Sequence, residues 1–201
     1  MLSMTLVADV GLVGVPNAGK STLLRAVTRA RPKVANYPFT TLIPNLGVCE
    51  MAAFGVRGKP MVWLDIPGLI EGAAAGKGLG LAFLRHTERC RLLLHLINGE
   101  SDDPVADLTS INKELSRYSE KLRDCPQVVL LTKTDLPQVA EAAPRILMDL
   151  KEAAGHGRVI AISSHGQRNL KALLTRTSAL LQQVPAATCQ MPPPACSCCS
   201  S

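Results

Sequence analysis

Residues 14–21 read Gly-Val-Pro-Asn-Ala-Gly-Lys-Ser, which matches the phosphate-binding pattern G-x-x-x-x-G-K-[ST]. The pattern follows an apolar run and precedes a helix-like segment, as a loop between a strand and a helix does. In such a loop the backbone N–H groups surround a β-phosphate, Lys20 reaches phosphate oxygens, and Ser21 offers a hydroxyl to Mg²⁺. We therefore expect a nucleoside triphosphate to be bound by Gly14, Val15, Pro16, Asn17, Ala18, Gly19, Lys20, Ser21 and Thr22.

Short apolar runs alternate with segments of helical period, which is the pattern of β-α units in a mostly parallel sheet. The expected fold class is α/β, a P-loop NTPase with a three-layer α/β/α sandwich and a mostly parallel six-stranded sheet. Strands are expected near 10–15, 45–54, 61–65, 92–98, 128–132 and 159–163. Helices are expected at 20–30, 80–89, 104–121, 138–154 and 167–183. A glycine-containing turn at 55–60 predicts that one strand is antiparallel.

The composition is that of one domain with a short tail. Of the 201 residues, 47% are apolar, which is enough for a buried core. Residues 1–183 are expected to form the domain, whereas the Pro-, Ser- and Cys-rich residues 184–201 lack apolar periodicity and are expected to be disordered. No apolar run approaches the roughly 18 residues of a membrane span, so a soluble protein is expected. The seven cysteines lack zinc spacing.

The net charge of +6 is unevenly distributed. Residues 1–100 contain 11 Lys and Arg against 6 Asp and Glu, whereas residues 101–201 contain 11 against 10. Four cations, Arg25, Arg29, Arg31 and Lys33, form either an RNA-facing patch or the solvated face of a helix. An aromatic content of 3% argues against a protein that stacks single-stranded bases on aromatic side chains.

Two further segments suit a triphosphate and its magnesium ion. Asp65, Ile66, Pro67 and Gly68 follow the third strand, where the carboxylate can hold Mg²⁺ through water and the Gly68 N–H can meet a γ-phosphate. Residues 37–42 form a proline-flanked loop whose threonine can complete the Mg²⁺ shell only when a γ-phosphate is present. The predicted metal ligands are Ser21, Thr41 and, through water, Asp65. The predicted nucleotide contacts of the loop are Phe39, Thr40, Thr41, Leu42 and Ile43.

Residues 132–135, Thr-Lys-Thr-Asp, follow the fifth strand and resemble the guanine-reading motif N-K-x-D with threonine in place of asparagine. Asp135 can accept two hydrogen bonds from guanine, a pairing that adenine cannot offer, and Lys133 can lay its stem along the base. Because Thr132 is shorter than asparagine, we expect its contact to the base or to the phosphate loop to be weakened. After the sixth strand, Ser163, Ser164 and His165 are expected to offer a backbone N–H to guanine O6.

Taken together, these segments resemble the Obg-type GTPases of the translation-factor-related class. The resemblance covers about residues 8–183, looks nearest to chloroplast and cyanobacterial-like members, and rests on residues 8–22, 35–47, 65–73, 78–80 and 83–90. It implies a monomeric switch that hydrolyses GTP to GDP with Mg²⁺ and acts in assembly of the large ribosomal subunit, with that subunit or its rRNA as partner. The implied location is the cytoplasm or the chloroplast stroma.

Two positions, Leu69 and Asn17, bear on the mechanism. Leu69 follows Gly68 where Ras-like enzymes have the glutamine that orients the attacking water. Asn17 matches the asparagine with which potassium-dependent relatives hold K⁺, so K⁺-stimulated hydrolysis is expected. The predicted catalytic residues are Lys20, Asn17, Thr41 and Gly68. The family's glycine-rich N-terminal domain has no room before residue 14 and is expected to be absent, as in a truncated gene product or a fragment.

Three other interpretations stay open at this point. The chain can be a nucleotide-binding module with little or no turnover, since Leu69 and Thr132 both depart from the usual pattern. It can be an ATPase, which competition between labelled GTP and ATP would decide. The ending Cys198-Cys199-Ser200-Ser201 superficially resembles a prenylation signal, although its central positions are not aliphatic.

Overall fold

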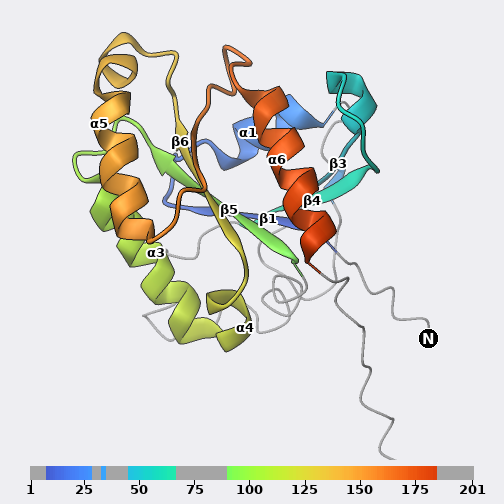
Figure 1. The fold of residues 1–201 in the computed structure, drawn as a ribbon, viewed down its shortest axis with the longest axis horizontal. Helices are drawn as coiled ribbons and strands as arrows, with labels where there is room; N and C mark the ends of the chain where they lie inside the picture. The colour runs from blue at the N-terminus through green and yellow to red at the C-terminus, as the bar shows by residue number, and fades with distance from the viewer. Residues whose placement is uncertain (1–7, 29–32, 35–44, 67–89, 185–201) are drawn as a thin grey trace, which may run out of the picture.

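The computed structural model describes residues 8–28, 33–34, 45–66 and 90–184 (Figure 1). Within these ranges one sheet has the strand order β2-β3-β4-β1-β5-β6-β7. The six expected strands are all present, and the two-residue β2 adds a seventh at the edge. The strands are β1 Val10–Gly14, β2 Lys33–Val34, β3 Asn45–Cys49, β4 Met61–Asp65, β5 Leu92–Asn98, β6 Gln127–Thr132 and β7 Val159–Ala161.

The central strands of the sheet are parallel. β1 lies between β4 and β5 and is parallel to both, and β6 and β7 continue the parallel order beyond β5. β3 is antiparallel to β4, with Asn45 opposite Asp65. The prediction of a mostly parallel sheet with one reversed strand is therefore confirmed.

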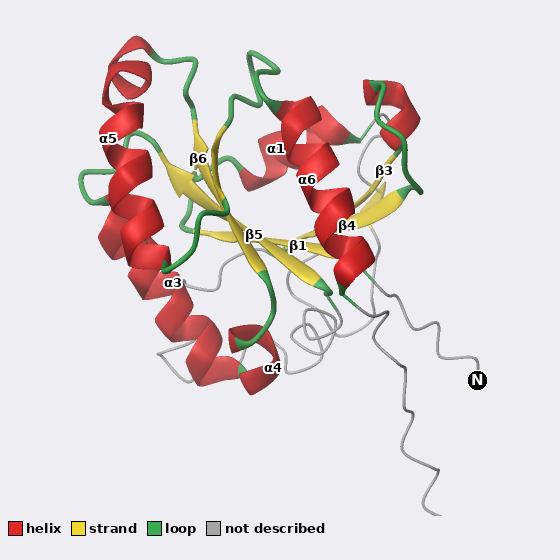
Figure 2. Cartoon of the chain, in the orientation of Figure 1, coloured by secondary structure: helices red, strands yellow, loops and turns green. Residues whose placement is uncertain are grey.

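Helices cover both faces of this sheet, as Figure 2 shows. Helices α1 and α6 lie on one face and share a single hydrophobic cluster with β1, β4 and β5. Helices α3, α4 and α5 lie on the other face and pack in two further clusters. The predicted three-layer sandwich is thus confirmed. The helices are α1 Lys20–Val27, the 3₁₀ turn η1 Met51–Phe54, α3 Pro104–Tyr118, α4 Glu120–Arg123, α5 Pro137–Ala154 and α6 Leu170–Gln183.

Several predicted boundaries were wrong. The helix expected at 20–30 ends at Val27, because Thr28 is extended with φ −108°, and the strand expected at 159–163 ends at Ala161. The strand expected at 45–54 ends at Cys49, because Met51 and Phe54 both pack on the core from one 3₁₀ turn that Gly55 closes with φ 63°. The helix expected at 104–121 is interrupted at Ser119, which is extended with φ −157°. The helix expected from 167 begins at Leu170, because Gln167 and Asn169 have positive φ angles.

Other predicted helix ends follow local chemistry. Asp103 caps α3 by accepting a hydrogen bond of 2.8 Å from the Ala106 N–H, and Pro104 occupies the first helical position. Asn169 precedes α6 as expected, but its side chain donates to the carbonyl of Ala161 instead of capping the helix. The helix expected at 80–89 and the tail at 184–201 lie outside the described residues, except for Val184.

The core is aliphatic, as the low aromatic content predicts. Strands β1, β5 and β6 carry runs of buried aliphatic side chains, the helices contribute further leucines, and Trp63 on β4 is fully buried. The free cysteines Cys49 and Cys90 are buried, and burial raises the pKa of the Cys49 thiol to about 11. Among the helices that the structure describes, none has the length and apolar character needed to cross a membrane.

Candidate nucleotide-binding site

The predicted site residues lie where the parallel strands end. β1 ends at Gly14, β4 at Asp65 and β6 at Thr132, and the loop after each strand begins there. Since β1, β4, β5 and β6 are parallel, their carboxyl ends meet at one edge of the sheet. Ligands of open α/β sheets bind at this edge, so the fold brings the separate sequence motifs together.

The loop between β1 and α1 has the backbone geometry that binding of phosphate requires. Gly14 has φ 152° and a Cβ there would collide with the carbonyl oxygen of Leu96, while Gly19 has φ 92° and is the N-cap residue of α1. The Lys20 ammonium donates hydrogen bonds of 2.8 Å to the Gly14 carbonyl and 3.0 Å to the Val15 carbonyl. The cation is thereby held against the loop at the N-terminus of α1, where the helix dipole also favours an anion.

Ser21 and Asp65 meet beside this loop. The Ser21 hydroxyl donates a hydrogen bond of 2.5 Å to Asp65 Oδ2, and Asn45 on β3 lies 3.5 Å from the same oxygen. Asp65 is only 3% exposed, and its other oxygen, Oδ1, has no hydrogen-bond partner among the described residues. A buried carboxylate oxygen without a donor, next to a hydroxyl, fits a hard divalent cation such as Mg²⁺. Asn45 is a contact that the sequence motifs did not indicate.

Thr132 ties the end of β6 to the phosphate loop. Its hydroxyl oxygen lies 2.9 Å from the Ala18 carbonyl and 3.0 Å from the Ile97 carbonyl at the end of β5, and its side chain is 2% exposed. The threonine hydroxyl thus reaches the loop carbonyl directly, and the expectation that threonine weakens the contact to the base or to the phosphate loop stays a prediction. Thr132 therefore acts as a link between three segments of the site.

Lys133 is held by a partner that the sequence analysis missed. Its ammonium forms an ion pair of 2.6 Å with Glu100, and its backbone is left-handed with φ 59°. Glu100 follows β5 directly after Asn98-Gly99, so a charged residue at a strand end on the ligand edge was the available signal. This pair places the stem of Lys133 between β6 and the β5–α3 connection.

Asp135 is positioned by the turn after β7. The Ser163 hydroxyl donates a hydrogen bond of 2.6 Å to Asp135 Oδ1 and accepts one of 2.8 Å from the Gly166 N–H. This hydrogen bond from Ser163, more than the nearby charges of His165 and Arg168, lowers the pKa of the Asp135 carboxyl. The carboxylate is exposed and stays ionised, as an acceptor for two base N–H groups must be.

Backbone hydrogen bonds in the same turn limit which N–H group is available to donate to guanine O6. The Ser163 N–H already donates to the Arg168 carbonyl at 3.2 Å, and the Arg168 N–H donates to the Ser163 carbonyl at 3.0 Å. Of the three predicted residues, Ser164 and His165 are thus the ones whose N–H groups donate to no backbone carbonyl of the described residues. Ser163 contributes through its side chain.

The remaining predicted site residues lie outside the described part of the chain. These are Phe39, Thr40, Thr41, Leu42 and Ile43 of the threonine loop, together with Pro67 and Gly68. Leu69, which follows them, also lies outside the described residues. Ile66, the last described residue before them, is buried and donates its N–H to the Leu12 carbonyl at 3.2 Å. Asn17, which was predicted to hold K⁺, is exposed on the phosphate loop with φ 61°.

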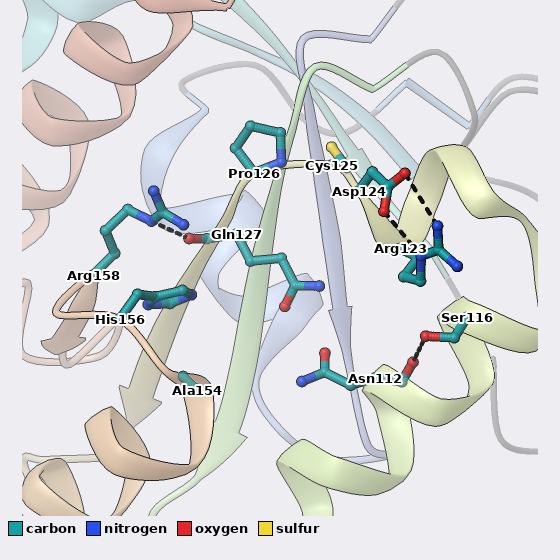
Figure 3. A pocket seen from close by; sticks show the side chains of 10 residues that line it. All are labelled: Asn112, Ser116, Arg123, Asp124, Cys125, Pro126, Gln127, Ala154, His156 and Arg158. Atoms are coloured by element: carbon teal, nitrogen blue, oxygen red, sulfur yellow. Dashed lines mark hydrogen bonds and ion pairs between the residues drawn. The ribbon is translucent and has the colours of Figure 1, made fainter.

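A cavity of about 480 Å³ lies at the other end of the sheet, where β6 begins (Figure 3). Figure 3 shows the side chains of Asn112, Gln127 and His156 directed into the same space. Asn112 and Gln127 also lie against His95, a fully buried residue of β5. Burial lowers the pKa of His95 to about 4, so this imidazole is neutral. The cavity contains none of the predicted site residues.

A loop of the phosphate-binding pattern, a buried carboxylate beside a hydroxyl, and an exposed, ionised carboxylate at the same sheet edge are typical of P-loop guanine-nucleotide-binding domains. The sequence comparisons agree with this class. The family described as "50S ribosome-binding GTPase" matches residues 9–133. The chain belongs to this family, and within it to the Obg-type GTPases.

Two curated relatives illustrate the match. A protein named GTPase Obg from Caldanaerobacter subterraneus is 50% identical over 188 residues, which cover 92% of this chain and 43% of the relative. GTPase Obg from a Synechococcus strain is 49% identical over 176 residues, covering 88% of this chain and 52% of the relative. The chain thus spans about half the length of the curated relatives it matches.

Solved structures support the fold. Aquifex aeolicus Era bound to GDP and AlF4⁻ has a TM-score of 0.64 at 22% identity, covering 92% of this chain and 60% of Era. The G domain of the T. maritima FeoB iron transporter has a TM-score of 0.62 at 22% identity, covering 86% of this chain and 98% of that domain. At such identity the likeness establishes the P-loop GTPase fold alone.

Proposed function

We propose that this chain binds GTP with Mg²⁺, hydrolyses it to GDP and phosphate, and acts as a switch in assembly of the large ribosomal subunit. The observation that carries the proposal is the meeting of Ser21 with the buried Asp65 beside the phosphate loop, at the same sheet edge as Asp135. The pair of Ser21 and Asp65 suits a triphosphate with its metal, and Asp135, held by Ser163, suits guanine.

The residues of the site have distinct parts in this proposal. Lys20 and the N–H groups at the start of α1 neutralise charge on the β- and γ-phosphates. Ser21 and Asp65 would hold Mg²⁺, the carboxylate through water, and the ion would neutralise charge that develops on the phosphate oxygens. Thr132 keeps the loop fixed to the sheet, so the donors need no reorganisation during the reaction. Thr41 and Gly68 are proposed to sense the γ-phosphate.

K⁺ is proposed as an activator through Asn17. This asparagine is exposed on the phosphate loop, where its amide oxygen is a suitable ligand for a monovalent cation. Leu69 cannot orient water, so added positive charge beside the phosphates has more to contribute than in an enzyme with glutamine there. We expect faster hydrolysis in KCl than in NaCl, and an Asn17→Ala variant that loses the difference. Equal rates for the unchanged protein in the two salts would refute the role of K⁺.

The base preference is tested at Asp135. Asp135→Asn removes the acceptor pair for guanine N1 and N2 and offers a donor, so we expect GTP affinity to fall by at least about 100-fold and xanthosine triphosphate to bind better than GTP. Asp149→Asn, an exposed change on α5, is the matched control. Competition by ATP as strong as that by GTP would exclude the guanine assignment.

A second candidate function is nucleotide binding without useful turnover. Leu69 at the position of the water-orienting residue favours it. A single-turnover assay with labelled GTP separates the two functions: release of phosphate in one turnover supports the switch, whereas tight binding without release supports the module.

The ribosomal role is tested by sedimentation. Membership of the family supports this role, because the family description names binding to the 50S ribosome. We propose that the role is carried out in the cytoplasm or the chloroplast stroma. We expect the chain with a non-hydrolysable GTP analogue to co-sediment with isolated large subunits more strongly than the chain with GDP. Equal co-sedimentation with large and small subunits would contradict the proposal.

A further inference from the structure

The two helical layers of the domain carry different charge. Helices α3, α4 and α5 contain six acidic and six basic residues, so the charge of that layer is balanced. Helices α1 and α6 contain four basic residues and no acidic residue. The excess positive charge in the described part of the chain is therefore concentrated on the α1/α6 side of the sheet.

Six exposed cations lie on that side, and we call them the basic face. Within the segments 20–28, 50–60 and 163–184 they are accompanied by one acidic residue, Glu50. None of the six forms an ion pair with another described residue. The members of the basic face are Arg25, Arg57, Lys59, Arg168, Lys171 and Arg176.

The segments that carry these cations are packed together. Leu23 and Leu24 of α1, Val56 of the β3–β4 connection and Leu174 of α6 belong to one buried cluster. A Cβ built on Gly55 would lie 3.7 Å from the Lys171 ammonium, which therefore extends along the connection between η1 and β4. The basic face is thus continuous from the β3–β4 connection across α6.

One end of the basic face borders the base site. Arg168 closes the turn that begins at Ser163, and its charge contributes to the lowered pKa of Asp135. A polyanion on this face would therefore lie beside the bound guanine. Arg168 and its neighbour His165 join the two surfaces.

We propose that the basic face binds the phosphate backbone of structured, double-helical RNA. Unpaired cations arranged over a surface release counterions when phosphates replace them, and this supplies affinity without base contacts. Single-stranded RNA fits less well, because stacking of bases needs exposed aromatic rings, whereas Trp63 is buried and Phe54 packs on the core. The proposal rests on the ribosomal role above for the source of the RNA.

Two other classes of partner suit this face less well. A membrane surface needs large apolar side chains beside the cations, and a protein partner needs apolar or aromatic anchors. Among the described residues the exposed large hydrophobic side chains are Val48 on β3 and Met148 on α5, so α1 and α6 carry none. The exposed residues of α6 beside its cations are small or polar, such as Ala172, Thr175 and Ala179.

The test measures binding of the chain to a fluorescent RNA duplex of about 20 base pairs by anisotropy, at several salt concentrations. For five or six phosphate contacts, we expect the logarithm of the binding constant to fall with the logarithm of salt concentration with a slope of about −5. Lys171→Glu/Arg176→Glu should weaken binding at least tenfold and reduce the slope by about 2. Arg57→Glu/Lys59→Glu, on the β3–β4 connection, should act in the same direction.

The matched control is Lys113→Glu/Lys151→Glu, which makes the same change of charge at exposed positions of α3 and α5. Binding of a fluorescent GDP analogue shows that each variant is folded. Equal weakening by the control pair would overturn the proposal, and so would RNA binding that is unchanged by both basic-face pairs. Stronger binding to phosphatidylserine vesicles than to RNA would overturn it in favour of a membrane. Loss of GTP hydrolysis with RNA binding intact would contradict only the proposed enzymatic function.

Discussion

Ser163 and Asp135 are joined by a hydrogen bond of 2.6 Å between the Ser163 hydroxyl and Asp135 Oδ1. Twenty-eight positions separate the two residues, and the folding of β6, α5 and β7 brings them together. The bond fixes the direction of a carboxylate that is otherwise exposed, and it lowers the pKa of that carboxyl. Asp135, which we propose reads the base, is thereby pre-organised before nucleotide binds.

Ser163→Ala is expected to weaken GTP binding by roughly five- to tenfold, because a hydrogen bond to a charged group is lost. It should also change the pH dependence. With a lowered pKa, Asp135 stays ionised as pH falls until its folded-state pKa is reached. Removing the donor raises that pKa, so loss of affinity should begin at a higher pH. Because the ordinary pKa of an Asp carboxyl is already 3.8, calorimetric titrations with GTP from pH 7.5 down to about 3 measure both effects.

The control for this variant is Ser164→Ala, which removes a neighbouring hydroxyl that has no contact with Asp135 among the described bonds. Circular dichroism at each pH confirms that the protein stays folded. An acid limb of GTP affinity at the same pH in Ser163→Ala and the unchanged protein would contradict the role of this hydrogen bond.

The sequence predicted the residues of this site better than the links between them. Lys20, Ser21 and Asp65 belong to motifs of fixed spacing that follow strands, so periodicity and pattern placed them at one edge. The ion pair of Lys133 with Glu100 and the bond of Ser163 with Asp135 depend on how loops from different strands face one another. No local spacing encodes such pairings.

Two element boundaries, at Cys49 and at Ser119, were predicted wrongly for a related physical reason. Apolar residues continue beyond Cys49, and this predicts a strand across 45–54. In the structure, however, Met51 and Phe54 pack on the core from a single helical turn. The break at Ser119 has no glycine or proline to mark it. Tertiary packing decided both positions, and the sequence carries only a weak local signal for it.

Thr132→Val is expected to lower the free energy of unfolding by about 1–3 kcal/mol, since the buried carbonyls of Ala18 and Ile97 would lose their shared donor. The change keeps the volume of the side chain, so packing is largely unaffected. GTP affinity should fall as well, because the phosphate loop is no longer tied to β6. Urea denaturation and GTP titration measure the two losses. Thr132→Ser, which keeps the hydroxyl, should retain most of both, and equal behaviour of the two variants would exclude the proposed link.

Glu100→Gln tests whether the ion pair with Lys133 serves GTP binding or the stability of the fold. The side chains of Lys133 and Glu100 are 32% and 42% exposed, so solvent screens their pairing and the effect on stability should be below about 1 kcal/mol. GTP affinity should fall two- to fivefold at low salt, because Lys133 is less restrained beside the base, and the deficit should shrink as salt rises. Glu141→Gln on α5 is the control. A large fall in melting temperature with unchanged affinity would show that the pair is structural.

His95→Leu tests the buried imidazole of β5. Burial lowers the pKa of His95 from 6.5 to about 4, and the nearby amides of Asn112 and Gln127 only partly oppose this shift. The unfolded chain therefore takes up a proton below pH 6.5 that the folded protein does not, so the folded state loses stability as pH falls from 6.5 to about 4. For one such group the loss is about 3 kcal/mol over that window.

In His95→Leu this part of the acid sensitivity should disappear, whatever the stability of the variant at pH 8. Urea midpoints and slopes at pH 8, 6.5, 5.5 and 4.5 give the free energies, and the difference between the two proteins isolates the contribution of His95 from that of the carboxylates. His156→Asn provides a comparison, because His156 also has a lowered pKa but is half-buried and should contribute less. Parallel pH profiles for His95→Leu and the unchanged protein would mean that His95 takes up its proton in the folded state, with Asn112 and Gln127 as the acceptors that allow it.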